Sequence, residues 1–468
     1  MKATIFLTTL IVFLTQISIA QNFNHAKLDN YFDALETNDL FMGSVAVSQN
    51  GEIIYTKSVG FSDFENKVKA NENSKYRIGS ITKTFTSVLT LKAVEGKKLT
   101  LDQTIENYFP TIKNSNKITI KHLLSHRSGI HNFTSNENYR TWDRQSKTER
   151  EMVEIITKGG SDFEPGSKTV YSNSNYVLLT YILEKTFKKP YSALLKTYIT
   201  EPVGLKSTFF GKKINTDNNE CKSYKFVDNW KAESETDISI PLGAGGIVST
   251  SKDLVKFSDA LFNGKLLSAK SLELMKTYSL GLFQGKLNNK TSFGHNGAID
   301  AFTSLFSYFP EESISFALTS NGKNYDNIDI LKTVLNAIYS KSYEVPKKSI
   351  YLEISGKVIQ DVSIGIESYL SLKKEHPDEY DFDNSNELNR LGYVLLELDK
   401  NQSAIEIFKL ATTEFLENAN LFDSLGEAYF IDKQYDLALS NYKKAIVLGG
   451  TNGNAKKMVD KIEKVKGK

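Results

Sequence analysis

Cysteine is almost absent from this sequence. Its 468 residues include one, Cys221, so no disulfide can form within the chain. Cys221 stands in the stretch NNECKSYK, without a predicted helix start or a neighbouring base, and we interpret it as an incidental thiol rather than a nucleophile. A chain without disulfides depends on its hydrophobic core for stability, and a chain of this length can bury a large one.

A dominant charge of one sign is also missing. The formal net charge is +3, whereas nucleic-acid binding requires a concentrated basic surface. We therefore expect no nucleic-acid partner. Hydrophobic residues make up 40% and charged residues 24% of the chain, which is typical of soluble globular proteins, and the length favours two domains.

Long apolar runs are confined to the N-terminal segment, positions 1–20. Lys2 provides a positive start, an apolar run follows, and Ser18 and Ala20 stand at the −3 and −1 positions of a cleavage site before Gln21. This pattern predicts a signal peptide over residues 1–20 and export to the periplasm or the extracellular medium. A membrane anchor is the weaker alternative, because the run is short and polar residues interrupt it. No later stretch is long and apolar enough for a stable membrane span.

Alternating hydrophobicity predicts an antiparallel sheet in the following region. Residues 42–60 alternate on both sides of Asn50-Gly51, a dipeptide typical of tight hairpins. Residues 302–320 resemble two further strands, and a helix over 327–340 is expected to pack on the sheet. The region between the two strand pairs is mainly helical in pattern. A sheet built from both ends, with helices inserted between them, predicts an α+β fold.

The C-terminal part of the chain repeats itself. Leu391-Gly392 recurs as Leu425-Gly426, Ala404 as Ala438, Phe408 as Tyr442 and Ala411 as Ala445, all at one constant offset. This offset and the residue pattern resemble tetratricopeptide repeats. We predict an all-α repeat domain over 384–468 that could dock a protein partner, a helix and linker over 346–383, and capping helices over 355–375 and 453–466. An unrelated helical hairpin is the alternative, and it leaves the coincident offsets unexplained.

A serine three residues before a lysine occurs five times, so this pattern alone is a weak signal. The five serines are Ser80, Ser249, Ser320, Ser371 and Ser440. Ser249 precedes the capped start of a helix over 251–262, Ser320 precedes an Asn-Gly turn, and the last two lie in charged or repeat helices. Ser80 differs because it follows Gly79 and opens an apolar helix that ends at Gly96.

Ser80 and Lys83 form a candidate nucleophile and base. A serine in the first turn of a buried helix lies near unpaired backbone N–H groups and the positive end of the helix dipole. Lys83, three residues on, lies on the same helix face. Burial lowers the pKa of a lysine because desolvation disfavours the ammonium, and a neutral lysine can accept the serine proton. The pair therefore predicts a serine hydrolase.

Two later motifs single out this pair. They are Tyr171-Ser172-Asn173, after a Pro-Gly turn, and His295-Asn296-Gly297, which enters a predicted strand. With Ser80 and Lys83 they resemble the three ordered motifs of serine β-lactamases, penicillin-binding D-alanyl-D-alanine carboxypeptidases and related esterases, above all the class C β-lactamase branch. The resemblance runs from about Leu40 to Gly322, with further landmarks at 118–130, 201–205 and 243–254. It implies a β-lactamase/transpeptidase-like catalytic domain over 21–345, with an all-helical subdomain beside the sheet.

The resemblance also implies roles for the motif residues. Ser80 would attack the carbonyl carbon and form an acyl-enzyme, and Lys83 and Tyr171 would share the proton transfers. Asn173 would orient Lys83 and the substrate amide. The backbone N–H groups of Ser80 and Ala298 would form the oxyanion hole. His295, followed by Asn296 and Gly297, would line the substrate pocket opposite Ser80 and form a hydrogen bond with the substrate or Tyr171.

Histidine in the third motif affects which substrates we expect the protein to bind. A lysine there would hold the carboxylate of a β-lactam or a D-alanine terminus permanently, whereas histidine is mostly neutral at pH 7. We expect a small-molecule or peptide acyl donor, namely an ester, a D-amino-acid amide or peptide, or a β-lactam. The alternative is a non-hydrolytic sensor of penicillin or peptidoglycan fragments whose repeats dock a partner protein.

The sequence predicts no cofactor and no metal ion. His122 and His126 have the four-residue spacing of a helical metal pair, but no acidic general base stands between them. The stretch around them is one of the family landmarks. We therefore favour packing and hydrogen-bonding roles for both histidines.

Overall fold

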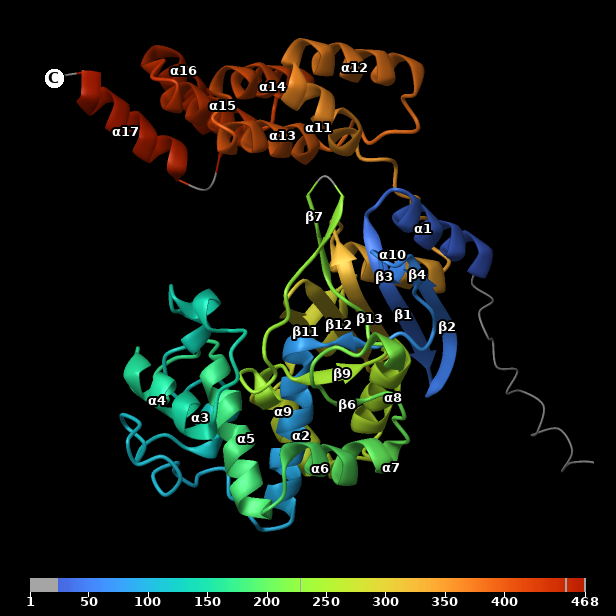
Figure 1. The fold of residues 1–468 in the computed structure, drawn as a ribbon, viewed down its shortest axis with the longest axis vertical. Helices are drawn as coiled ribbons and strands as arrows, with labels where there is room; N and C mark the ends of the chain where they lie inside the picture. Colours follow the sequence, from blue (N-terminus) through green and yellow to red (C-terminus); the bar gives the residue numbers. More distant parts are fainter. Residues whose placement is uncertain (1–23, 228, 451–452, 467–468) are drawn as a thin grey trace, which may run out of the picture. The chain divides into compact units, whose positions relative to one another are not determined.

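The computed structural model describes residues 24–227, 229–450 and 453–466, and the chain forms two compact units. The first unit ends at Glu344 and the second begins at Val345 (Figure 1). The signal peptide predicted over residues 1–20 lies outside the described residues. Within the described ranges, no helix combines the length and the apolar composition that crossing a membrane requires.

A six-stranded antiparallel sheet forms the centre of the first unit. Its strands lie in the order β10 (Phe283–Leu287), β11 (Lys290–Ile299), β12 (Phe302–Phe309), β13 (Ile314–Lys323), β1 (Phe41–Gln49) and β2 (Glu52–Val59). Asn50 and Gly51, with φ of +54° and +82°, make the tight turn between β1 and β2 and confirm the predicted hairpin. Because β1 also pairs with β13, strands from both ends of the unit meet in one sheet, as predicted.

Helices cover both faces of this sheet. They are α1 (His25–Thr37) and α10 (Asn327–Ile338) on one face, and α2 (Thr82–Glu95) and α8 (Ser251–Phe262) on the other. Neighbouring residues of β13 alternate between the two layers, with Phe316 in the core of α1 and α10 and Ala317 in the core of α2 and α8. The rings of Phe85 and Phe257 stack at 3.7 Å and join α2 to α8. The segment with the candidate nucleophile therefore begins a helix that is fixed in a core.

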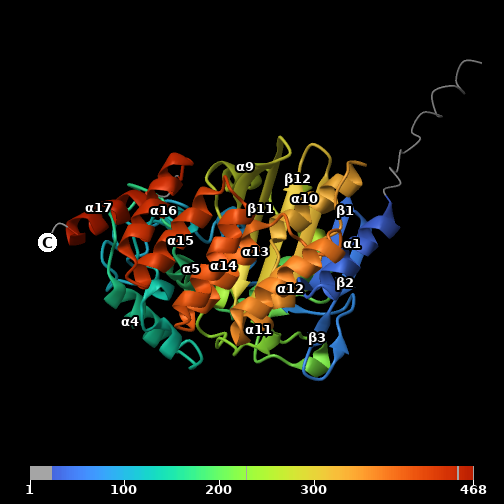
Figure 2. The same cartoon turned by 90° about the horizontal axis from the view of Figure 1, so that it is seen from above.

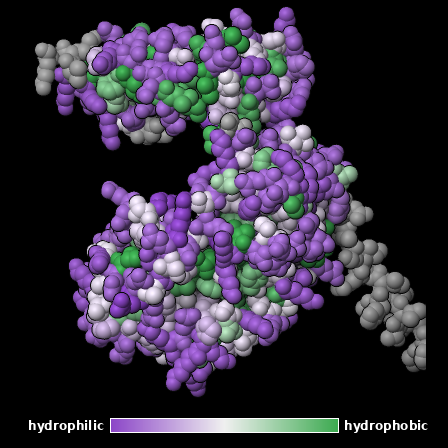
Figure 3. Space-filling model, in the orientation of Figure 1, coloured by the Kyte–Doolittle hydropathy of each residue, from purple (hydrophilic) through white to green (hydrophobic). Residues whose placement is uncertain are grey.

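The remaining elements of this unit are inserted between the first and last strands of the sheet. The helices are α3 (Ile120–Leu124), α4 (Glu149–Gly159), α5 (Asn173–Phe187), α6 (Tyr191–Leu195), α7 (Glu201–Val203) and α9 (Ala269–Thr277). The short strands are β3 (Phe61–Asp63), β4 (Val68–Lys69), β5 (Tyr76–Arg77), β6 (Phe209–Phe210), β7 (Tyr224–Phe226), β8 (Trp230–Ala232) and β9 (Ile247–Ser249). This arrangement confirms the predicted α+β fold with a helical subdomain. The face drawn in Figure 3 is mainly hydrophilic.

The structure corrects the turn predicted at Asn321-Gly322. Both residues lie within β13, where Gly322 pairs with Met42 of β1. The Asn321 amide nitrogen donates to the carbonyl oxygens of Phe61 (2.9 Å) and Lys222 (2.8 Å). These partners are distant in the sequence, and they hold an Asn-Gly dipeptide in an extended strand.

The second unit is helical. Its helices are α11 (Ile350–Gln360), α12 (Val362–Glu375), α13 (Ser385–Glu397), α14 (Asn401–Glu414), α15 (Ala419–Ile431), α16 (Tyr435–Val447) and α17 (Asn454–Lys466), which follow one another in chain order (Figure 2). The one helix predicted over 355–375 is two helices. They are separated because Asp361 is extended and its carboxylate accepts the backbone N–H groups of Ser363 (2.8 Å) and Ile364 (3.4 Å).

The repeat offset reappears in the helices of the second unit. The starts of α13 and α15, and those of α14 and α16, are separated by the same offset as the repeated residues. A Cβ atom at Gly392 would lie 2.4 Å from the Phe408 ring, and one at Gly426 would lie 3.0 Å from the Tyr442 ring. Each glycine thus allows the same close approach of an aromatic ring in its own helix pair. The tetratricopeptide assignment itself remains a prediction.

Candidate active site

Ser80 lies where a short strand passes into a helix of the core. The strand β5 leads through the 3₁₀ turn η1 (Gly79–Ile81) into α2. Gly79 has φ of +49°, and a Cβ atom there would lie 2.7 Å from the backbone nitrogen of Ala298 on β11. Glycine is therefore needed for this conformation and this approach. As a result, Ser80 faces the strand that carries the third motif.

Lys83 is fully buried and its amine contacts three oxygen atoms. Its Nζ atom lies 2.9 Å from Ser80 Oγ, 2.8 Å from Asn173 Oδ1 and 2.7 Å from the carbonyl oxygen of Ala244. Burial holds the pKa of Lys83 well below its ordinary value. A neutral amine has two N–H groups and one lone pair. Because the amide and carbonyl oxygens can only accept, they take the two N–H groups, and the lone pair remains for the Ser80 hydroxyl proton.

The side-chain amide of Asn173 has a fixed orientation. Its nitrogen Nδ2 donates to Thr134 Oγ1 (3.1 Å), and Thr134 Oγ1 in turn donates to Asn132 Oδ1 (3.1 Å). The same Asn132 oxygen accepts the backbone N–H of Asn173 (3.0 Å). Since the Thr134 hydroxyl already donates its one proton to Asn132, it must act as the acceptor in its hydrogen bond with Asn173. This bond leaves Asn173 Oδ1 directed at Lys83.

Tyr171 contacts the nucleophile from the other side. Its Oη atom donates to Ser80 Oγ at 2.9 Å, although the residue as a whole is 37% exposed. Burial of the hydroxyl raises the pKa of Tyr171 to about 12, against the opposing effect of the bond to Ser80. Tyr171 is therefore a neutral donor at pH 7. Lys83 is the partner that can accept the Ser80 proton.

His126 holds the segment that carries Tyr171. The two rings lie 4.4 Å apart between centroids, His126 Nδ1 accepts the Ser172 N–H (3.2 Å), and the His126 carbonyl accepts the Val170 N–H (2.9 Å). Burial, with a smaller contribution from Lys83, lowers the pKa of His126 to about 3. The ring is therefore neutral, and Nδ1 keeps the lone pair that the Ser172 bond requires. These contacts give His126 the packing and hydrogen-bonding role that we favoured.

The glycine of the third motif allows β11 to approach the serine turn. A Cβ atom at Gly297 would lie 2.0 Å from the carbonyl oxygen of Ile78 and 2.5 Å from Ser304 Oγ. Gly79 and Gly297 together bring the two backbones into contact. The backbone nitrogen of Ala298 consequently lies beside the Gly79-Ser80 segment.

His295 is a buried residue of β11. The residue is 3% exposed, its ring packs against that of Phe283 with centroids 4.6 Å apart, and its Nδ1 atom lies 2.6 Å from the carbonyl oxygen of Asn296. The role predicted from the sequence, in which His295 lines the substrate pocket and bonds Tyr171 or the substrate, remains a prediction. Strand alternation leaves Asn296 and Ala298 exposed on β11 and buries His295 and Gly297. Burial lowers the pKa of His295 to about 3, so this ring is also neutral.

A cavity of about 170 Å³ opens beside Ser80. Its walls include three of the predicted site residues, Ser80, Asn173 and Ala298, together with Phe133, Thr134, Tyr139, Arg140, Thr236, Ala244 and Asp300. The structure thus brings the first two motifs and the end of the third around one small chamber. Its size suits a small acyl group.

The family model described as Beta-lactamase matches residues 28–338. The chain belongs to the beta-lactamase family. The match covers the sheet, α2 and all three motifs, and it ends before the second unit begins.

Among curated members, the chain is similar to PbpX of Bacillus subtilis, provisionally named a penicillin-binding protein, with 28% identity over 305 residues, 64% of this chain and 74% of that protein. It is also 28% identical over 258 residues to the teichoic acid D-alanine hydrolase of Staphylococcus aureus, covering 55% of this chain and 62% of the hydrolase. The chain therefore spans less than two thirds of that hydrolase. Among solved beta-lactamase-fold structures, the D-amino acid amidase of Ochrobactrum anthropi SV3 is 27% identical, with a TM-score of 0.59, over 67% of this chain and 99% of the amidase.

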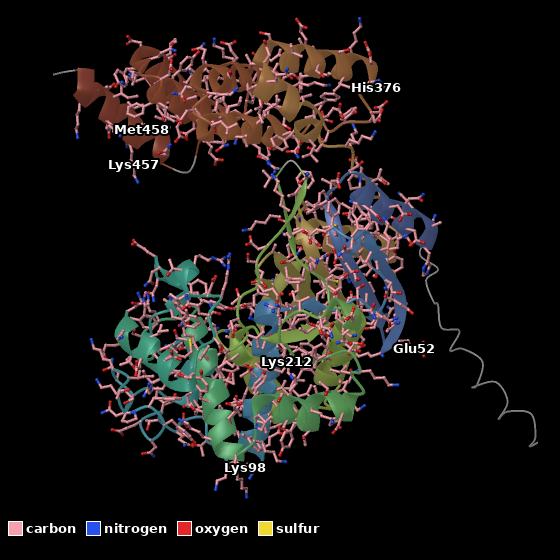
Figure 4. The ribbon with its side chains drawn as sticks, in the orientation of Figure 1. Glu52, Lys98, Lys212, His376, Lys457 and Met458 are labelled. Atoms are coloured by element: carbon pink, nitrogen blue, oxygen red, sulfur yellow. The ribbon has the colours of Figure 1, made fainter. Side chains whose placement is uncertain are left out.

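An ion cluster around the buried Arg77 side chain lies at the wall of the cavity and was not predicted from the sequence. The Arg77 guanidinium contacts Asp300 Oδ2 (3.0 Å), Glu235 Oε2 (2.8 Å) and the carbonyl oxygen of Thr236 (2.8 Å). It also donates to the carbonyl oxygen of Lys212 (3.1 Å), a residue labelled in Figure 4. Arg77 lies two residues before the serine turn, and Asp300 lies three residues after the third motif. No local pattern marks these residues, because the ion pairs join segments that are distant in the sequence.

Replacing Gly297 with alanine tests the contact between β11 and the serine turn. The added methyl group would lie 2.0 Å from the Ile78 carbonyl oxygen, so the strand or the turn must move. We expect a loss of unfolding free energy of about 1–3 kcal/mol, typical of overpacking, and a clear loss of kcat. Thermal unfolding and hydrolysis assays measure the two effects. Gly356→Ala is the control, since a Cβ atom there meets no atom within 4 Å; equal effects of both variants would contradict this assignment.

Proposed function

We propose that this protein hydrolyses D-aminoacyl esters or amides through an acyl-enzyme on Ser80. The observation that carries the proposal is the position of Ser80 Oγ, 2.9 Å from both Lys83 Nζ and Tyr171 Oη. Lys83 offers a lone pair and Tyr171 offers a proton, so the serine has a base on one side and a donor on the other.

The acylation step follows from this arrangement. The Ser80 proton passes to Lys83 Nζ as Oγ attacks the carbonyl carbon, and the backbone N–H groups of Ser80 and Ala298 receive the developing oxyanion. The leaving alcohol or amine takes up the Tyr171 hydroxyl proton, and the proton held on the Lys83 ammonium then restores the Tyr171 hydroxyl, so that both side chains end in their starting states. The bond between the carbonyl carbon and the leaving group then breaks.

Deacylation uses the same groups in reverse order. Water gives a proton toward Lys83 and its oxygen attacks the Ser80 ester. The bond between Ser80 Oγ and the acyl carbon breaks, Ser80 regains its proton, and the free acid leaves. Each cycle therefore consumes one water and releases one acid and one alcohol or amine.

The substrate class rests on the relatives and on the size of the cavity. The Staphylococcus aureus relative is a D-alanine hydrolase of teichoic acid, and the Ochrobactrum anthropi relative is a D-amino acid amidase. A cavity of about 170 Å³ suits an acyl group as small as D-alanyl. The neutral His295 supplies no permanent charge for a β-lactam carboxylate. We therefore propose D-aminoacyl donors, rather than β-lactams, as the preferred substrates.

A substrate panel tests this function. The purified protein and its Ser80→Ala variant are incubated with a D-alanyl ester, D-phenylalanine amide, a D-alanyl-D-alanine peptide and a chromogenic cephalosporin. We expect Ser80-dependent turnover of the D-aminoacyl donors at higher kcat/KM than of the cephalosporin. A penicillin adduct on Ser80 that never turns over, with no hydrolysis of any donor, would favour the alternative role as a sensor.

We expect kcat/KM to fall as the pH is lowered below neutral and not to fall between neutral pH and about pH 10. Lys83 must be neutral to accept the proton, so activity falls as the pH drops through its lowered pKa. Tyr171 must be protonated to donate, and its pKa of about 12 keeps it so. Hydrolysis of an amide substrate measured from about pH 5 to about pH 10, with Ser80→Ala subtracted, gives the profile. A fall in activity between neutral pH and about pH 10 would contradict these assignments.

Export and partner docking extend this proposal beyond the catalytic unit. Residues 1–20 have the pattern of a signal peptide, and a D-alanyl ester or peptide substrate of the cell envelope agrees with export. The helix pairs with the constant offset agree with a tetratricopeptide-like domain that docks a protein partner. Comparing turnover by the whole chain with that of a chain ending at Glu344 separates the two roles, because small-substrate hydrolysis is expected to persist without the second unit.

A further inference from the structure

Arg140 shares the catalytic cavity with the nucleophile. It lies in the 3₁₀ turn η3 (Tyr139–Thr141), and it lines the cavity together with Ser80 and Asn173. Its side chain is 70% exposed, so the guanidinium is accessible to a ligand that enters from solvent. Sequence motifs gave no signal for this residue.

The position of the Arg140 guanidinium is fixed by a buried carboxylate. Asp143, with a side chain 2% exposed, holds Arg140 Nη1 at 3.0 Å through Oδ2. Asp143 is itself fixed, since its backbone carbonyl accepts the Asp237 N–H at 2.9 Å. A guanidinium carries five N–H donors, so one ion-paired nitrogen leaves donors for a second oxyanion.

Aromatic packing stiffens the same turn. The Tyr139 ring lies 5.2 Å from Trp142 in an edge-on arrangement and 5.9 Å from Phe133, and the Arg140 guanidinium lies 5.7 Å from the Tyr139 ring. A cation held in place by its surroundings loses little entropy when a ligand binds. The turn therefore presents Arg140 as a preorganised group.

The other basic residues named above at this site are buried. Arg77, 2% exposed, is paired with Asp300 and Glu235. Lys83 and His295 are also buried, and burial lowers the pKa of each side chain. Of the charged residues on the described cavity wall, Arg140 and Asp300, only Arg140 has an exposed side chain, since that of Asp300 is 1% exposed.

We propose that Arg140 forms an anion subsite, which selects acyl donors that carry a carboxylate or phosphate group near the scissile bond. The inference rests on the proposed function and narrows its substrate class. Within D-aminoacyl donors, the anion could be the terminal carboxylate of a D-alanyl-D-alanine peptide or the phosphate of a D-alanylated polyol phosphate. Both present oxyanions that a guanidinium binds through charge-assisted hydrogen bonds.

Two matched substrate pairs test the subsite on the full chain. The first pair is an acetylated D-alanyl-D-alanine peptide with a free carboxylate and its carboxamide. The second pair is the D-alanyl ester of glycerol phosphate and that of glycerol. Within at least one pair, the wild-type protein is expected to favour the anionic member by about tenfold in kcat/KM, and the preference should fall as salt is raised. The pair that shows the preference identifies the source of the anion.

Arg140→Gln is expected to bring the ratio within that pair close to one. Because the ratio cancels the fraction of active protein, reduced folding of the variant cannot imitate this result. The control is Arg150→Gln on α4, where Arg150 is 87% exposed beside Glu154 (3.8 Å), and it should keep the wild-type ratio. Hydrolysis without a preference for either anionic member, or a preference that survives in Arg140→Gln, would overturn the subsite alone. No Ser80-dependent turnover of any of the four substrates would contradict the proposed function and, with it, the subsite.

Discussion

Replacing Lys83 with methionine is expected to lower kcat/KM by about 10²–10⁴-fold, the usual contribution of a general base. Methionine has a similar length and apolar stem, so the helix should keep its packing while the Ser80 proton loses its acceptor. Steady-state hydrolysis of the best donor from the substrate panel measures the loss. Lys92→Met, two to three turns further along α2, is the control and should change kcat/KM by less than about threefold.

The same variant has a second signature in folding stability. The pKa of Lys83 is lower in the folded chain than its ordinary value of 10.5. Between these two pKa values the unfolded chain binds a proton at Lys83 that the folded chain does not, and this difference makes the free energy of unfolding rise with pH. Lys83→Met removes this difference in proton binding. Urea unfolding of the catalytic unit should therefore show a steeper rise of stability with pH in the wild type than in Lys83→Met, and parallel curves would contradict a neutral buried lysine.

Replacing His126 with glycine is expected to lower kcat by about 10- to 100-fold. Because His126 has φ of +56°, glycine and asparagine both tolerate its backbone conformation. Glycine removes the ring under Tyr171 and the acceptor for the Ser172 N–H, whereas asparagine keeps an acceptor oxygen on a short side chain. We therefore expect His126→Asn to retain more activity than His126→Gly, with the larger change in kcat rather than in KM.

His122 provides the matched control for this experiment. It lies four residues away, and its Nδ1 atom accepts the Thr119 N–H at 3.3 Å in the cap of α3. His122→Gln should leave kcat within about threefold of the wild type. Equal losses in His126→Gly and His126→Asn, or a similar loss in His122→Gln, would contradict the role of His126 in holding Tyr171.

Local patterns in the sequence predicted the elements that local forces specify. The β1–β2 hairpin follows from Asn50-Gly51 and flanking alternation, and α2 follows from its apolar run and from Gly96 as its C-terminal cap. The predicted turn at Asn321-Gly322 is wrong because two distant partners, Phe61 and Lys222, hold this dipeptide extended. The single helix predicted over 355–375 is wrong for a local reason, since Asp361 is extended and caps the start of a second helix.

The candidate site contains some residues that sequence motifs mark and others that no motif marks. Ser80, Lys83, Tyr171 and Asn173 were found because ordered motifs mark them, and the structure joins them by direct hydrogen bonds. The contact between the His295 and Phe283 rings joins two strands, and the motif around His295 does not encode it. Arg77–Asp300 and Arg140–Asp143 belong to no motif, so only the folded chain shows them beside the cavity.

The most direct test of the central claim is peptide mass spectrometry of the protein quenched during turnover of a D-alanyl ester. The account predicts one added alanyl group on the peptide that contains Ser80, its loss as hydrolysis proceeds, and no such adduct in Ser80→Ala. Continued hydrolysis by Ser80→Ala, or an alanyl group attached to a different residue, would contradict Ser80 as the nucleophile.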